Sequence, residues 1–141
     1  MFRGLARPAS RVHIQVMILG TGIDLANTHR IAAFRKRWQA RGLQRLFTPG
    51  EIEYCVRVAH PDLSFAARFA AKEAFFKALG TGFGLGGSWR DVEVVRGARG
   101  KPRLRLRGRA AALVRKRGVR RIHLSLSHTA ELAVAQVLLE R

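Results

Sequence analysis

Two charged side chains, Glu73 and Lys77, have a spacing that suits either a surface ion pair or a functional site. They lie one helical turn apart in the segment RFAAKEAFFKALGTGFG (68–84), about 40° apart in helical projection. An exposed i, i+4 pair would stabilise the helix by about 0.2–0.5 kcal/mol. Alanines form one face of this predicted helix and large apolar residues occupy much of the other. Since little room is left for a solvated face, a functional site competes with the surface interpretation.

A third charged residue, Asp24, lies where a predicted strand meets a predicted helix. Its carboxylate could cap the helix or bind a metal ion, and the two roles are compatible. His128 follows the residues SLS at the end of another predicted strand, where a structural hydrogen bond is the default role. No H-x-x-x-H pattern or Cys/His grouping indicates zinc.

A glycine-rich loop follows the alanine-rich helix. Gly82, Gly84 and Gly87 match the pattern G-x-G-x-x-G. The dinucleotide-binding fingerprint needs a strand before it and a helix after it, and here the order is reversed. The absence of a following G-K-[ST] also excludes a P-loop. The loop is either a connector, which its sequence alone favours, or a segment whose backbone N–H groups approach an anion.

The remaining pattern predicts one α+β domain, built from an antiparallel sheet packed with helices. Thr48, Pro49 and Glu51 form a capping-box start for a helix, and Gly80 is the predicted stop of the alanine-rich helix. The predicted strands are 17–23, 89–95, 102–107, 121–128 and 131–140, and the predicted helices are 27–43, 49–58, 64–79 and 109–118.

The first 16 residues stand apart from this pattern. They are basic, contain no acidic residue and hold no continuous apolar core of a secretory signal. We interpret residues 1–16 as an N-terminal extension: a disordered arm, a transit-like peptide, or an overlong start with Met17 as the true first residue. Residues 17–141 form the predicted domain.

The composition limits the partners of the chain. Of its 141 residues, 22 are arginine and five are lysine, and the formal net charge is +18. Such a surplus predicts polyanionic partners such as nucleic acid, an anionic membrane, phosphorylated ligands or an acidic protein. A single cysteine, Cys55, favours a reducing cytoplasm, and no apolar run is long enough to span a bilayer.

Two basic segments have no assigned purpose. The first is 103–109, which alternates basic and apolar residues over 103–107, and the second is 115–121. On a strand, the alternation would give one basic face. Nucleic-acid binding by that face is disfavoured because no aromatic side chain interleaves with the basic residues to stack on bases.

Four separated segments together resemble the holo-(acyl-carrier-protein) synthase family, the small bacterial 4'-phosphopantetheinyl transferases. The resemblance covers residues 17–141, and the segment 68–84 is close to diagnostic of the family. The other segments are GTGIDLANTHRI (20–31), GKPRLRL (100–106) and SLSHTAELAVAQV (125–137).

The resemblance implies a fold and a reaction. In this family a serine hydroxyl of an apo acyl carrier protein attacks the β-phosphorus of coenzyme A, phosphopantetheine is transferred, and adenosine 3',5'-bisphosphate leaves. Magnesium is the implied cofactor, with Asp24 and Glu73 as its carboxylate ligands. Lys77 is the implied phosphate contact, and Glu73 is our candidate base, acting directly or through a metal-bound water.

The resemblance also implies roles for other residues. Arg68 and His128 match positions near the 3'-phosphate or adenine. The glycines Gly80 and Gly82 belong to the loop that approaches the cofactor. The adenine-side loop is matched by Gly100, Lys101 and Pro102. The basic positions that engage the acidic carrier protein are matched by Arg30 and Arg37 on the first helix.

The family further implies a cytoplasmic homotrimer with active sites between subunits and no membrane partner. The leading alternative is an arginine-rich structural protein that binds nucleic acid, and we disfavour it because a pure polyanion binder gains nothing from Glu73 on a buried helix. A catalytically silent homologue that docks the carrier protein is a third interpretation. The sequence leaves open whether a fatty-acid or a polyketide carrier is served, and whether Mg²⁺ or Mn²⁺ is preferred.

Overall fold

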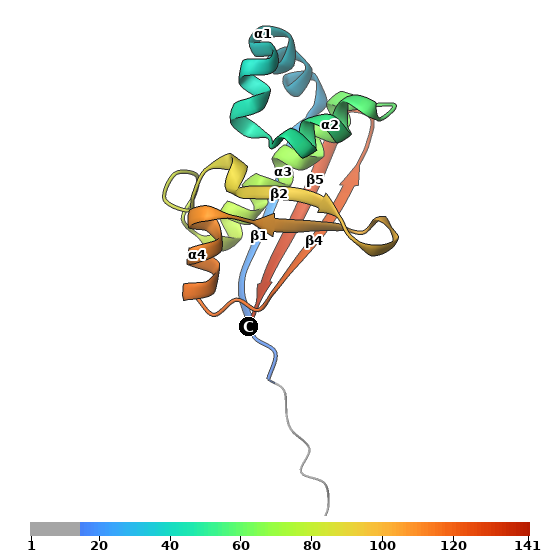
Figure 1. Cartoon of the computed structure of the whole chain (residues 1–141). Coiled ribbons are helices and arrows are strands. Elements are labelled where there is room, and N and C mark those ends of the chain that lie inside the picture. The colour runs from blue at the N-terminus through green and yellow to red at the C-terminus, as the bar shows by residue number, and fades with distance from the viewer. Residues whose placement is uncertain (1–14) are drawn as a thin grey trace, which may run out of the picture.

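The order of the elements is strand, three helices, hairpin, helix and hairpin, as the sequence predicts. A computed structural model describes residues 15–141 (Figure 1), so residues 1–14 of the predicted extension lie outside the described part. The helices and strands are β1 (Ile18–Asn27), α1 (Thr28–Leu46), α2 (Pro49–Arg57), α3 (Pro61–Leu79), β2 (Val92–Arg96), β3 (Pro102–Leu106), α4 (Gly108–Lys116), β4 (Arg121–His128) and β5 (Leu132–Glu140). Two 3₁₀ turns flank β2, namely η1 (Trp89–Asp91) and η2 (Ala98–Gly100). The α+β class is confirmed.

The strands form two antiparallel sheets rather than one. The larger has the order β1-β5-β4, so the last strand of the chain lies between the first strand and β4. The smaller is the β2–β3 hairpin. Helix α3 packs across the larger sheet and is covered by the hairpin on its other side (Figure 1). A local sequence pattern carries no information on which strands pair at a distance, so this division emerges only in three dimensions.

Strand β1 is four residues longer than predicted at its C-terminal end. Leu25 and Ala26 continue the pairing with β5, opposite Val134 and Ala133. Asp24 therefore lies within the strand, and its predicted role as a helix cap is wrong. The cap of α1 is Asn27, whose Oδ1 accepts hydrogen bonds from the backbone N–H groups of the next helical turn, at 2.9 and 3.2 Å.

The start of α3 also differs from the prediction. The helix begins at Pro61 rather than at about residue 64. Proline suits the first helical position because its fixed φ matches the helix and its missing N–H would have no helical partner there. Helix α2 ends at Arg57, and Pro61 is the first residue of α3.

Strand β1 approaches α3 unusually closely at two glycines. A Cβ atom placed on Gly22 would overlap the carbonyl oxygen of Ala74, and one placed on Gly20 would overlap that of Ala78. All four residues are small, so the two backbones pack against each other without intervening side chains. This contact brings the following segment of β1, which carries Asp24, onto the side of α3.

A buried polar network holds the other side of α3. Lys72 and Glu51 have fully buried side chains, and Lys72 Nζ donates to Glu51 Oε2 over 2.7 Å. The same ammonium donates to the carbonyl oxygens of Trp89 and Val92, at 3.0 and 2.6 Å. Glu51 also completes the capping box of α2 by accepting from the N–H of Thr48. The network thereby joins α2, α3 and the β2–β3 hairpin.

Among the helices of the described residues, we find none with the length and apolar character needed to cross a membrane.

The close contact between β1 and α3 makes a testable prediction. Gly22→Ala should lower the free energy of unfolding by more than about 2 kcal/mol, because its methyl group overlaps backbone that no side-chain rotation can move. Thr21→Ala, on the exposed face of the same strand, is the matched control and should cost less than about 1 kcal/mol. Urea unfolding measures both. Equal stability of the Gly22→Ala variant and the parent chain would contradict this packing.

Candidate active site

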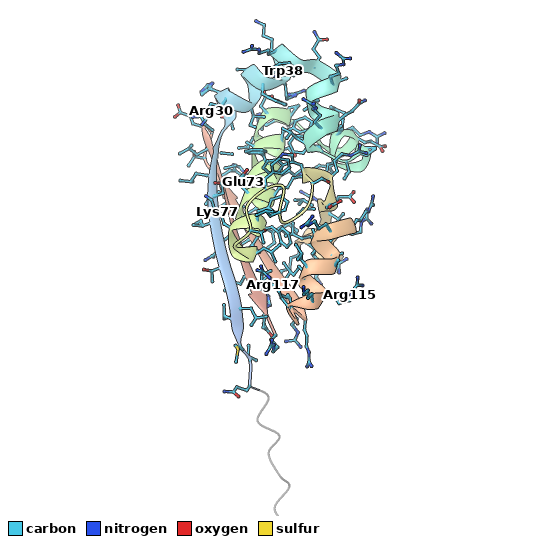
Figure 2. All side chains as sticks on the ribbon, turned by 90° about the vertical axis from the view of Figure 1, so that its left-hand side faces the viewer. Arg30, Trp38, Glu73, Lys77, Arg115 and Arg117 are labelled. Carbon is cyan, nitrogen blue, oxygen red and sulfur yellow. The ribbon has the colours of Figure 1, made fainter. Side chains whose placement is uncertain are left out.

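Three predicted site residues, from β1 and α3, converge. Lys77 Nζ donates to Asp24 Oδ1 over 2.8 Å and to the carbonyl oxygen of Ile23 over 3.0 Å. The side chain of Asp24 is 16% exposed and that of Lys77 is 52% exposed, so the pair lies at the edge of solvent. Figure 2 shows Glu73 and Lys77 in succession along α3, beside β1. Within residues 15–141, the ion-pair partner of Lys77 is thus Asp24 and not Glu73.

The surroundings of Glu73 disfavour the negative charge of its carboxylate. Burial raises the pKa of its carboxyl group, and the negative charge of Asp24 raises it further. Lys77 acts in the opposite direction but does not cancel these two effects. A half-buried carboxylate beside a second carboxylate is stabilised by any cation that reaches both. The arrangement is therefore suited to a cation that bridges Asp24 and Glu73.

The donor set fits magnesium. Asp24 and Glu73 supply carboxylate oxygens, and within residues 15–141 no group of three or more His, Cys, Asp or Glu side chains forms a metal cluster. Zinc sites in proteins use three or four such ligands, whereas Mg²⁺ is commonly held by one or two carboxylates together with waters and substrate phosphates. Two carboxylates with a lysine beside them are the expected protein share of such a site.

A second group of predicted residues lines a pocket of about 460 Å³. Arg68, Gly100, Pro102 and His128 all contribute to its wall. These residues come from α3, the β2–β3 connection, the start of β3 and the end of β4. The resemblance assigns these residues to the adenine and 3'-phosphate side of coenzyme A, and those roles stay predictions. Lys101 is exposed and does not line the pocket.

Arg68 is the buried cation of this pocket. Its guanidinium donates to Ser64 Oγ over 2.8 Å and lies 4.2 Å from the centre of the Tyr54 ring. Its Nε is buried, and within residues 15–141 it has no hydrogen-bond partner. A buried guanidinium with an unused donor is suited to an anionic ligand, because the anion would satisfy the donor and offset the cost of burying the charge.

The pocket and the carboxylates lie on different sides of α3. Arg68 and Glu73 are five residues apart, which corresponds to about 140° around a helix. Neither Asp24 nor Glu73 lines the pocket. One chain therefore presents the two halves of the predicted site separately. The helical spacing of Arg68 and Glu73 is consistent with this separation, but the pocket itself is formed by residues from α3, the β2–β3 hairpin and β4, which only the fold brings together.

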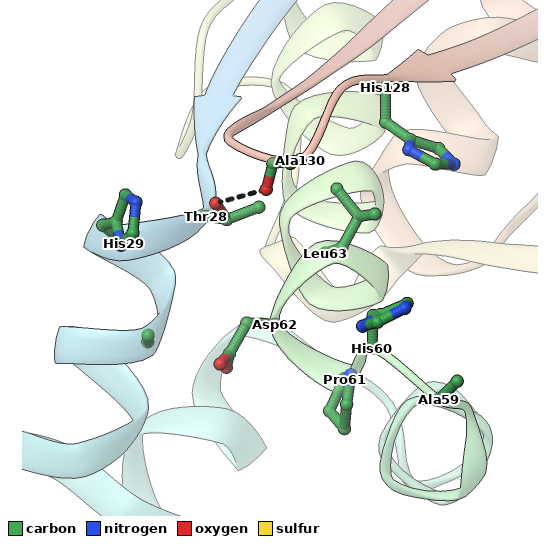
Figure 3. A pocket seen from close by; sticks show the side chains of 10 residues that line it. Thr28, His29, Ala59, His60, Pro61, Asp62, Leu63, His128 and Ala130 are labelled. Atoms are coloured by element: carbon green, nitrogen blue, oxygen red, sulfur yellow. Dashed lines mark hydrogen bonds between the residues drawn. The ribbon is translucent and has the colours of Figure 1, made fainter.

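A neighbouring pocket of about 480 Å³ shares His60 and His128 with the first (Figure 3). Its other side is formed where α1 begins, and the hydroxyl of Thr28 donates there to the carbonyl oxygen of Ala130 over 3.2 Å. In the sequence, His60 precedes Pro61 and carries no signal of a site. Its place between two pockets has no local signal, because it results from the meeting of α3 with the turn between β4 and β5.

The glycine loop has a structural role at its first residue. Gly80 has φ 72°, the left-handed conformation that ends α3, and its N–H donates to the carbonyl oxygens of Phe76 and Lys77. Gly82 is exposed, with φ 66°. Phe83 anchors the loop by stacking on Trp89, with ring centroids 4.5 Å apart. Contacts of Gly80 and Gly82 with a cofactor stay predictions.

The two predicted carrier-binding arginines lie on α1, and both are exposed. Arg30 borders a pocket of about 350 Å³ whose wall includes Ile31 and Phe34. Arg37 lies over the exposed Trp38 ring, 5.1 Å from its centre. Helix α1 thus presents positive charge beside apolar surface. In Figure 2, Arg30 lies at the same side of the molecule as Glu73 and Lys77.

Residues 20–136 match the 4'-phosphopantetheinyl transferase superfamily. The chain belongs to this family. The match includes the residues of both halves of the site, from Asp24 to His128, and the enzyme is accordingly a phosphopantetheinyl transferase.

Individual relatives agree with this family. A holo-[acyl-carrier-protein] synthase of Koribacter versatilis is 51% identical over 124 residues, which cover 88% of this chain and 99% of the relative. The crystal structure of holo-[acyl-carrier-protein] synthase from Neisseria meningitidis matches with a TM-score of 0.82 at 33% identity, covering 89% of this chain and all of that one. The Helicobacter pylori synthase, solved in complex with coenzyme A, matches with a TM-score of 0.74 at 30% identity, covering 84% and 98% of the two chains. The alternative of a structural nucleic-acid-binding protein is not supported.

The coupling between the two carboxylates can be measured. Asp24→Asn should lower the pKa of Glu73, because it removes the neighbouring negative charge and frees Lys77. Carboxyl-detected NMR titration of labelled glutamate reads this shift. Asp62→Asn is the control and should leave Glu73 unchanged, since Asp62 lies about 16 Å away along α3 and pairs with Arg35. An unchanged or raised pKa of Glu73 in Asp24→Asn would show that the carboxylates do not interact.

Proposed function

We propose that the enzyme transfers 4'-phosphopantetheine from coenzyme A to a serine of an apo acyl carrier protein. The observation that carries the proposal is the convergence of Asp24, Glu73 and Lys77 from β1 and α3. The relatives named holo-[acyl-carrier-protein] synthase and the coenzyme A complex of the Helicobacter pylori protein support the substrate pair.

The groups of the chain supply the following steps. The serine Oγ attacks the β-phosphorus of coenzyme A, and its proton passes to the Glu73 carboxylate, directly or through a water molecule. A new Oγ–phosphorus bond forms, and the bond to the bridging oxygen of the diphosphate breaks. The electron pair stays on that oxygen, which leaves with adenosine 3',5'-bisphosphate. Lys77 is placed to contact the negative charge on the diphosphate.

Magnesium is the cofactor that the two carboxylates would hold. When bound by Asp24 and Glu73, it neutralises charge on the diphosphate and on the leaving phosphate. The mutual repulsion of the two carboxylates, which raises the pKa of Glu73, favours a site that would hold such a cation. Lys77 pairs with Asp24 in the chain alone and would contact the substrate diphosphate once Asp24 bound the cation instead.

We also propose a homotrimer in which each site is completed by two protomers. The pocket around Arg68 and the carboxylates face different sides of α3, so the pocket of one protomer and the carboxylates of its neighbour can serve one coenzyme A molecule. The face of the β1-β5-β4 sheet that points away from α3 supports such an assembly. On that face Ile23 and Leu25 are 59% and 64% exposed. A second copy would bury them.

The carrier protein binds at α1 in this proposal. Exposed Arg30 and Arg37 attract the acidic carrier, and the apolar pocket beside Arg30 contacts its uncharged surface. Opposite charges speed diffusional encounter and make it sensitive to salt. The serine of the carrier then reaches Glu73, which lies on the same side of the molecule (Figure 2).

The central test is a mass measurement on the carrier. With coenzyme A and Mg²⁺, the enzyme should add one phosphopantetheine mass to apo acyl carrier protein, whereas Glu73→Gln should lose turnover while keeping its circular-dichroism spectrum. In the metal-free chain the raised pKa keeps a proton on Glu73 to higher pH than on an ordinary glutamate, so the apparent affinity for Mg²⁺ should fall as the pH is lowered through the pKa of Glu73. Unchanged turnover in Glu73→Gln would overturn the role of this residue, and no mass gain with tight Mg²⁺-independent RNA binding would overturn the proposed function.

The docking role of α1 has its own test. Arg30→Glu should raise the KM for carrier protein by about tenfold or more and leave the KM for coenzyme A unchanged, because a surface charge on the docking helix acts on encounter. Lys116→Glu carries the same charge change at the far end of the molecule and serves as the control. A selective rise in the KM for coenzyme A in Arg30→Glu would contradict the assignment.

A further inference from the structure

One end of the molecule carries a dense group of cations that the transfer reaction does not use. We call it the basic end, and its basic residues are Arg115, Lys116, Arg117, Arg120, Arg121 and Arg141. They come from the last turn of α4, the segment that leads into β4, the first residue of β4, and the residue after β5. In Figure 1 these segments meet at the end of the molecule opposite α1.

Little of this charge is neutralised by the chain itself. The acidic side chain among these residues is Glu140, which pairs with Arg121 over 3.2 Å and with His123 over 2.7 Å. Within residues 15–141, no carboxylate lies within 4 Å of the charged groups of Arg115, Lys116 or Arg120, and residues 1–14 contain no acidic residue. The uncompensated charge is therefore available to an external anion.

Arg117, one cation of the group, makes a structural contact within the chain. The guanidinium of Arg117 donates to the carbonyl oxygen of Leu79 at the C-terminal end of α3, where a positive charge complements the helix dipole. Arg141 reaches the carbonyl oxygen of Arg117. These contacts explain two of the six residues. They leave Arg115, Lys116 and Arg120 without a partner within the described residues.

Exposed apolar side chains lie beside the same cations. Val16, Met17 and Ile18 are 56%, 45% and 49% exposed, and the backbone N–H of Arg141 donates to the carbonyl oxygen of Met17 over 2.9 Å. Val16 and Met17 directly precede β1 and Ile18 is its first residue, so exposed apolar side chains lie next to Arg141. Charge alone would suit any polyanion, but exposed apolar residues among cations suit a surface with an apolar layer beneath an anionic one.

We propose that the basic end binds the surface of an anionic lipid bilayer. Arg115, Lys116 and Arg120 contact anionic headgroups, and Met17 and Ile18 enter the region between headgroups and acyl chains. A nucleic acid is the less suitable partner, because at this end no exposed aromatic residue of the described chain could stack on bases. Binding by this end leaves α1 pointing away from the bilayer, so carrier protein can still reach the transferase site (Figure 2).

Sedimentation with lipid vesicles tests the proposal on the full chain. Vesicles of equal parts phosphatidylglycerol and phosphatidylcholine should bind the protein, and pure phosphatidylcholine vesicles should not. Arg115→Glu with Lys116→Glu and Arg120→Glu should weaken binding on the order of a hundredfold, because each cation near an anionic surface contributes severalfold. Met17→Ser with Ile18→Ser should remove the part of the binding that survives 0.5 M salt, about tenfold or more.

Matched controls distinguish binding by the basic end from an effect of net charge and from misfolding of the variants. Lys36→Glu with Arg41→Glu and Arg45→Glu makes the same charge change at the α1 end and should keep vesicle binding within about threefold. The corresponding glutamine variant of the basic end tests the same residues without introducing negative charge. Transfer to dissolved carrier protein should be unchanged in the basic-end variants, so the outcome is independent of the transferase proposal. Equal loss of binding in both triple glutamate variants, or tighter binding to duplex DNA or tRNA than to anionic vesicles, would overturn the proposal.

Discussion

The buried ion pair between Lys72 and Glu51 is the interaction on which the arrangement of the site depends. Both side chains are fully buried, and the Lys72 ammonium donates hydrogen bonds to three oxygen atoms from three elements. Burial lowers the pKa of Lys72, while Glu51 acts in the opposite direction. Loss of either partner would leave an uncompensated charge in the core, at a cost of about 3–5 kcal/mol. The pair therefore fixes the rotation of α3 against α2 and the β2–β3 hairpin.

That rotation decides where the next residue points. Glu73 follows Lys72 by about 100° around the helix, so a lysine held toward the hairpin turns the glutamate toward β1. The small-residue contact at Gly20 and Gly22 then allows β1 to come close enough for Asp24 to oppose it. The packing that fixes α3 in the core therefore also sets the geometry of the site. The hairpin that Lys72 holds also carries Gly100 and Pro102, which line the pocket around Arg68.

The electrostatics of the molecule is organised along its length. Cations on α1 face the proposed carrier protein, the carboxylates of Asp24 on β1 and Glu73 on α3 lie between the two ends, and uncompensated cations gather at the opposite end. A chain with a net charge of +18 would repel a divalent cation unless acidic residues were concentrated at one place. Asp24 and Glu73 provide that local reversal of sign, and their mutual repulsion is the energy that a bound cation recovers.

The sequence by itself determined the elements whose signals are local: the capping box at Thr48, the glycine stop at Gly80, and the common face of Glu73 and Lys77. Four separated motifs also identified the family, because their residues and their order can be recognised in the sequence without knowledge of the fold. Only the tertiary structure decided that Lys77 pairs with Asp24, that β1 extends past it, and that Arg68 faces a different pocket. These outcomes depend on which backbones pack closely and on how α3 is rotated. Both are set by contacts between residues distant in the chain, such as Lys72 with Glu51, for which no local spacing exists.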